Sequence, residues 1–95
     1  MADLQCPATA VLLDAAAGPP TWLSRLRIAG RFDAGGREAV VALVDETADL
    51  YRGEAFVVTA SAEDLEAALR MRGVDAVAPS IIEVDSAGWH PVSPP

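Results

Sequence analysis

The most regular alternation of apolar and polar residues lies between Trp22 and Asp33. Successive side chains of a strand point to opposite faces of a sheet, so this pattern predicts one strand with two unlike faces. The apolar parity carries four large side chains: Trp22, Leu26, Ile28 and Phe32. The polar parity carries three basic ones: Arg25, Arg27 and Arg31. We therefore expect one face in the core and an arginine face outside it.

Shorter apolar runs predict the other strands, because each is bounded by glycine, proline or a polar turn. These strands cover residues 8–14, 54–59 and 81–84, and a return strand at 89–92 is an open alternative. The alanines at 15–17 either extend the first strand or form a helical turn. Asp33-Ala34-Gly35-Gly36 is typical of a turn.

Residues 38–51 allow two interpretations. The β-branched run from Val40 to Val44 suits a hairpin strand. However, the apolar residues recur at helical spacing over four turns, and Gly53 follows where a helix would end. The helix is the favoured interpretation.

A second helix is predicted to begin at Ser61. Ser61-Ala62-Glu63-Asp64 resembles a capping box, and an apolar stripe runs through Leu65, Ala68 and Leu69. Gly73 is placed to end this helix.

The resulting order is strand, strand, helix, strand, helix, strand and a last strand. It predicts an α+β fold, in which a sheet of four to five strands carries two helices on one face. Ninety-five residues suit a single domain over 1–95, with 1–8 and 93–95 expected to fray.

Charge is unevenly distributed along this acidic chain of formal net charge −7. Residues 1–37 carry four Arg against three Asp, a net +1, whereas residues 38–95 carry three Arg against eleven carboxylates, a net −8. The acidic second half opposes nucleic-acid binding. We expect a cytoplasmic protein, because the chain has a single cysteine and its N-terminus does not resemble a signal peptide. We expect no membrane span, because no apolar run is long enough.

The arginine face of Arg25, Arg27 and Arg31 is the main candidate ligand site. Guanidinium groups bind phosphate or carboxylate in a bidentate manner, so a small anionic ligand is one interpretation. The other, which we favour, is a solvated face whose arginines pair weakly with neighbouring carboxylates.

Catalytic and metal chemistry have few candidates. His90 is the only histidine and lies near the end of the chain, while Cys6, the only cysteine, lies near the other end. No nucleophile–base pair or zinc ligand set is apparent from such spacing. Asp45, Glu46 and Asp49 are interpreted as a solvated helix face. We expect no catalytic residue, no metal and no cofactor.

Two tryptophans are candidates for a partner surface, because tryptophan is enriched at interaction hot spots. Trp22 is expected to be buried, which leaves Trp89 as the candidate. A protein partner or a homodimer is consistent with the unpaired strand edges of so small a sheet.

Residues 25–32, RLRIAGRF, resemble a strand of the small α+β accessory domain found with haem-utilisation and pyridoxamine-phosphate-oxidase-like split-barrel proteins. Residues 58–63 are similar to a segment of that family but lack its proline, and residues 73–79 look like its glycine-to-proline segment. This resemblance implies an accessory role, in which the domain packs on a flavin- or haem-binding barrel without catalysing a reaction.

Residues 46–54, 56–59, 79–84 and 88–89 resemble the C-terminal part of histidine phosphatases. Ala60-Ser61 stands where that family has a His-Gly pair, and its Arg-His-Gly motif is missing after the first strand. This second resemblance implies a degenerate phosphatase-like domain with a vestigial phosphate pocket and no activity. Between these two functions, we favour a non-catalytic binding or protein-interaction module over a degenerate phosphatase-like domain.

Overall fold

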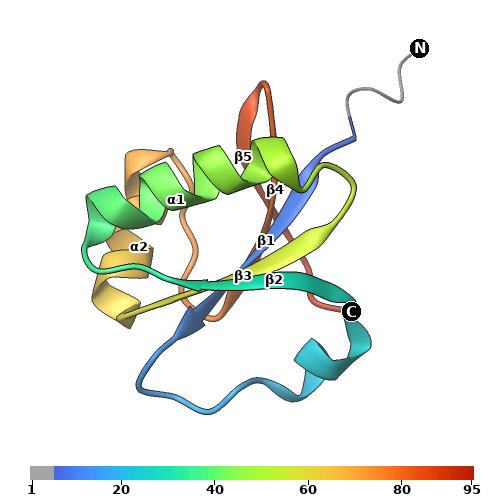
Figure 1. Cartoon of the computed structure of the whole chain (residues 1–95). Helices are drawn as coiled ribbons and strands as arrows, with labels where there is room; N and C mark the ends of the chain where they lie inside the picture. The colour runs from blue at the N-terminus through green and yellow to red at the C-terminus, as the bar shows by residue number, and fades with distance from the viewer. Residues whose placement is uncertain (1–5) are drawn as a thin grey trace.

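A computed structural model describes residues 6–95 of the chain (Figure 1). Its elements are, in order, β1 (Ala8–Asp14), the 3-10 helix η2 (Thr21–Arg25), β2 (Ile28–Asp33), α1 (Arg37–Leu50), β3 (Ala55–Ala60), α2 (Ala62–Met71), β4 (Ser80–Asp85) and β5 (Gly88–Val92). The predicted α+β fold and its order of strands and helices are confirmed.

The five strands form one mixed sheet in the order β2-β3-β1-β4-β5. β2, β3 and β1 run parallel, whereas β4 is antiparallel to β1 and β5 is antiparallel to β4. At the centre of the sheet, Val11 on β1 lies between Val57 on β3 and Ile81 on β4. β2 and β5 are therefore the two edges.

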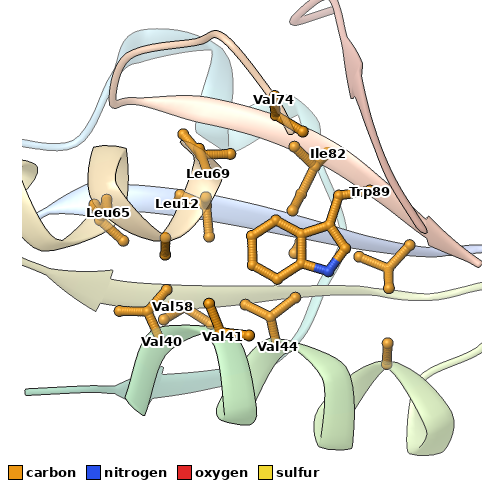
Figure 2. Close-up of a cluster of buried hydrophobic side chains, with 14 of the residues drawn as sticks. Leu12, Val40, Val41, Val44, Val58, Leu65, Leu69, Val74, Ile82 and Trp89 are labelled. Carbon is orange, nitrogen blue, oxygen red and sulfur yellow. The ribbon is translucent and has the colours of Figure 1, made fainter. Parts of the chain in front are cut away.

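Both helices cover the same face of the sheet, as predicted. The main core joins alternate strand residues such as Leu12, Val58 and Ile82 to apolar side chains of both helices (Figure 2). The opposite face is covered by η2, where Leu23 packs on Val11 and the other residues of a second cluster. The connections from β1 to β2 and from β2 to β3 run in opposite directions along the sheet. Because crossovers between parallel strands are right-handed, these two connections lie on opposite faces, which places η2 and α1 on different sides of the sheet.

α1 covers residues 37–50 and Tyr51 caps its end, so the helical interpretation of residues 38–51 is confirmed except at its last residue. α1 buries Val40, Val41, Val44, Thr47 and Ala48, a pattern of i, i+1, i+4, i+7 and i+8 that lies on one side of a helix. Gly36 precedes the helix with a φ of 99°, a conformation that favours glycine. The alternating pattern that a strand requires is absent from these buried positions.

α2 begins and ends as the sequence predicts. Ser61 Oγ accepts a hydrogen bond from Asp64 N at 3.1 Å, which caps the first turn. At the other end, Gly73 has a φ of +74° and its N–H donates to the Arg70 carbonyl, while Val74 N donates to the Leu69 carbonyl at 2.8 Å. These two bonds form a Schellman motif.

The prediction of one continuous strand over residues 22–33 is wrong. Residues 21–25 form η2 instead, which follows Pro20 and is held by hydrogen bonds from Leu23 N to the Pro20 carbonyl and from Leu26 N to the Leu23 carbonyl. Leu23, which belongs to the parity expected to be polar, is only 8% exposed. The turn after the two prolines therefore determines which side chains enter the core.

The expected single apolar face is also divided within β2. Ile28 pairs with Ala55, but Gly30 pairs with the very next residue of β3, Phe56, so β2 contains one extra residue at Ala29. Such a bulge reverses the parity of the side chains that follow it. Ile28 consequently packs on the η2 side of the sheet, whereas Phe32 packs on the helix side.

The first strand begins at the predicted residue, so the expected fraying does not extend to Ala8. Residues 1–5 of the predicted frayed end lie outside the described residues, but β1 already begins at Ala8, which is 1% exposed. The Pro7 carbonyl accepts a hydrogen bond from Gly53 N at 3.1 Å. Residues 93–95 follow β5 without regular secondary structure.

Candidate functional site

The three candidate arginines do not share one strand face. Arg25 belongs to η2, and its Nη1 donates to the Pro95 carbonyl at 3.4 Å. Arg27 precedes β2 and lines a hollow with Glu54, whereas Arg31 lies within β2 and lines a different groove. The 3-10 turn and the bulge separate them, since an unbroken strand would have aligned all three.

The groove beside Arg31 lies between η2 and β2 and has a volume of about 540 Å³. Five of its eight lining residues are apolar, namely Pro19, Pro20, Leu23, Leu26 and Ile28, and the others are Thr21, Ser24 and Arg31. The guanidinium of Arg31 is its one charged group among the described residues. Chemically, this arrangement suits an apolar group that carries a carboxylate or phosphate.

Trp89, the predicted partner surface, is instead part of the core, and that prediction is wrong. Only 6% of Trp89 is exposed, and its indole lies among Val44, Val74 and Ile82 (Figure 2). Burial suits a tryptophan whose N–H finds an acceptor, and here the acceptor is a carboxylate of α1.

That acceptor is Asp45, which was expected to be an ordinary solvated acid. Trp89 Nε1 donates to Asp45 Oδ1 at 2.8 Å, and Arg72 forms an ion pair with Asp45 Oδ2. The Arg72 guanidinium also lies 5.9 Å from the centroid of the Trp89 ring, within cation–π range. These three residues connect α1, the end of α2 and β5, so the cluster is structural in character.

The only histidine lies on the β4–β5 hairpin. His90 Nε2 is 3.1 Å from Asp85 Oδ1, and both side chains are partly exposed. The pKa of Asp85 is lowered from 3.8, first because Ala87 N–H donates to its carboxylate and second because His90 does so. This pair therefore fastens the two ends of a hairpin turn.

A hollow of about 570 Å³ lies where α1 begins beside α2. Arg37 and Arg70 line it, but so do three carboxylates, those of Glu38, Glu63 and Asp64. Asp64 Oδ2 already accepts a hydrogen bond from Gly36 N at 3.1 Å, so a carboxylate of the chain itself occupies the positive end of the helix. The balance of charge does not favour a further anion.

The outer edge of β2 combines free backbone groups with exposed charges. Ala34 N donates to the Thr59 carbonyl at 3.0 Å, which places even-numbered residues in the ladder with β3. Backbone groups alternate along a strand, so the N–H and C=O groups of Arg31 and Asp33 point away from the sheet. Both of these side chains are exposed.

An aromatic cluster lies behind this edge. Phe32, Tyr51 and Phe56 have ring centroids 5.7–6.3 Å apart, and Phe32 and Tyr51 are only partly buried. A Cβ atom at Gly30 would lie 2.6 Å from Tyr51 Oη, so glycine is needed for the tyrosine to cover the strand. The cluster places three of the five aromatic residues of the chain beside β2.

The opposite edge, β5, carries a proline. Counted from the two-residue turn at Ser86-Ala87, Pro91 faces Ile82 in a non-hydrogen-bonded pair. Its nitrogen consequently lies on the outer side, where an added strand would need an N–H donor. The two edges of the sheet therefore differ in their capacity to accept another strand.

Residues 6–95 contain no group of three or more His, Cys, Asp or Glu side chains that are placed to hold one metal ion. None of the helices in that range has the length and apolar character needed to cross a membrane. Comparisons with protein-family models, with curated proteins and with solved structures find no match to this chain.

Proposed function

We propose that this chain is a small, non-catalytic, cytoplasmic protein-interaction module that binds a partner along the outer edge of β2. The observation that carries the proposal is the outward direction of the backbone groups of Arg31 and Asp33 on a proline-free edge strand. An extended segment that adds to such an edge gains main-chain hydrogen bonds, and its side chains give specificity.

The composition of the edge supports a protein partner. Arg31 and Asp33 offer both signs of charge, and the half-buried ring of Phe32 offers apolar area that pairing would cover. Aromatic residues and arginine are the types most often found at interaction hot spots. The resemblance of residues 25–32 to an accessory domain makes a flavin- or haem-handling protein one partner class within this proposal.

The proposal is tested by capture from the native host with tagged wild type and with Arg31→Pro. The substitution removes one outward N–H, as Pro91 does on the other edge, so we expect the captured proteins to be lost. Ser93→Pro, outside the sheet, is the matched control and should capture the same proteins as wild type. Circular dichroism must show that both variants are folded. Equal capture by Arg31→Pro and wild type would place the binding surface elsewhere.

A small anionic ligand in the groove beside Arg31 is the second candidate, because the apolar wall there ends at a guanidinium. Thermal unfolding with phosphate, flavin and haem tests it, since a ligand that binds the folded state raises Tm. The shift should disappear in Arg31→Ala and persist in Arg27→Ala, which lines a different hollow. No rise in Tm with any of the three compounds would argue against this candidate.

A further inference from the structure

We infer that the partner of β2 is a second copy of this chain, paired antiparallel about a two-fold axis that passes through Phe32. The two sheets would then continue into one another. This inference rests on the proposed function, for which it names the partner.

The backbone sets the first condition. With the axis at Phe32, Arg31 of each copy lies opposite Asp33 of the other. Both residues point their N–H and C=O groups outward, so each pair can exchange two hydrogen bonds. A slip by one residue would place these outward groups opposite inward ones and break the ladder.

The side chains set the register. Arg31 and Asp33 pair with Val57 and Thr59 of β3 and therefore share one face of the sheet. In the proposed register, each guanidinium faces a carboxylate of the other copy, twice about the axis. A shift of the axis to Arg31 would set the two arginines against each other, and a shift to Asp33 would set two carboxylates against each other. Directly opposed like charges destabilise a strand pair, so charge selects one register.

The aromatic cluster adds apolar contact on the other face. Phe32 meets Phe32 of the second copy in a non-hydrogen-bonded pair, in which opposite Cβ atoms lie about 4.5–5.5 Å apart. Phe32 and Tyr51 are partly exposed in the single chain and would lose accessible surface. Both faces of the strand therefore favour the same arrangement.

The net charge of the chain opposes association of two copies, but the segment that contains β2 is not acidic. The whole chain carries a net charge of −7, but residues 1–37, which contain β2, carry four Arg against three Asp. The acidic surplus lies in residues 38–95. At the strand itself, Arg31 and Asp33 carry opposite charges, so β2 adds no net charge of its own to the repulsion between two copies.

A charge-exchange experiment tests the inference. Sedimentation equilibrium of wild type should give twice the chain mass of 9.9 kDa. R31D and D33R should each be monomeric, because each sets like charges opposite one another. A mixture of R31D with D33R should form a heterodimer, and the double variant R31D/D33R should dimerise again. Arg52→Asp, which changes an exposed charge outside β2, is the control and should remain dimeric.

Milder variants cover the case in which a single charge reversal fails to fold. Arg31→Ala removes both cross-strand ion pairs and should weaken dimerisation by about 2- to 30-fold, as expected for two such pairs. An unchanged dissociation constant in Arg31→Ala would overturn the inference.

The failure of this inference can be told apart from failure of the proposed function. A monomeric wild type, dimeric single charge variants, or singles that do not associate on mixing would each overturn self-pairing. Capture of a different protein through β2 by a monomeric wild type would leave the proposed function intact. If wild type captured neither its own copy nor another protein, both the self-pairing and the proposed function would be wrong.

Discussion

Trp89 Nε1 donates a hydrogen bond to Asp45 Oδ1 at 2.8 Å, across 44 positions of sequence. The indole is buried in the core, while the carboxylate lies at its border and also pairs with Arg72. A carboxylate of α1 thereby fixes the edge strand β5 against the helices.

Removal of the acceptor should destabilise the fold. In Asp45→Ala the buried indole N–H loses its partner, and an unsatisfied buried donor costs about 1–3 kcal/mol. Urea unfolding followed by tryptophan fluorescence measures the loss. Asp45→Asn, which keeps a carbonyl oxygen, is the matched control and should retain more of the stability. An unfolding free energy of Asp45→Ala equal to that of wild type would show that water replaces the carboxylate.

Gly30→Ala should also be destabilising, by about 1–3 kcal/mol, because the added Cβ would meet Tyr51 Oη at 2.6 Å and the Phe32 ring at 3.0 Å. Gly35→Ala is the control, since nothing lies within 4 Å of a Cβ built there. In a Tyr51→Ala background the penalty at Gly30 should shrink, and a double-mutant cycle of unfolding free energies measures that coupling. If the changes in unfolding free energy of Gly30→Ala and Tyr51→Ala were strictly additive, contact with Tyr51 would not be the cause of the destabilisation at Gly30.

The lowered pKa of Asp85 predicts a dependence of hairpin stability on pH. Its carboxyl has a folded pKa below the ordinary value of 3.8, because it accepts the Ala87 N–H and then the His90 ring. The stabilisation is therefore present above pH 3.8 and is lost as pH falls through the lower, folded pKa. NMR titration should give an Asp85 pKa below 3.8 that rises in His90→Ala. A pKa unchanged by that substitution would contradict the role of His90.

Ser61→Ala tests the cap of α2. The hydroxyl accepts from Asp64 N, and the loss of a serine cap costs about 1 kcal/mol in helical proteins. Thermal unfolding should show a lower Tm than wild type. Ser93→Ala, in a segment without regular structure, is the control and should unfold at the wild-type temperature.

The helices were predictable because their signals are local. Helix α2 is capped by Ser61 and ended by Gly73, and α1 shows its apolar side within four turns. Both signals rest on residues a few positions apart, where side-chain spacing determines secondary structure.

The candidate site was less predictable because its geometry depends on distant contacts. The alternation from Trp22 to Phe32 contains no sign of the extra residue at Ala29, which exists only relative to the register of β3. Likewise, nothing beside Trp89 indicates that its acceptor is Asp45 on α1. Spacing along the chain cannot report a pairing between elements that meet only after folding.

Pro91 has a consequence for aggregation. A sheet whose two edges both accept strands can add copies without limit, as fibres do. Here Pro91 removes a backbone donor from the outer edge of β5, which therefore does not accept a further strand. An assembly that pairs through β2 consequently ends after one strand is added. The pyrrolidine ring of Pro91 thus prevents this small sheet from growing into a filament.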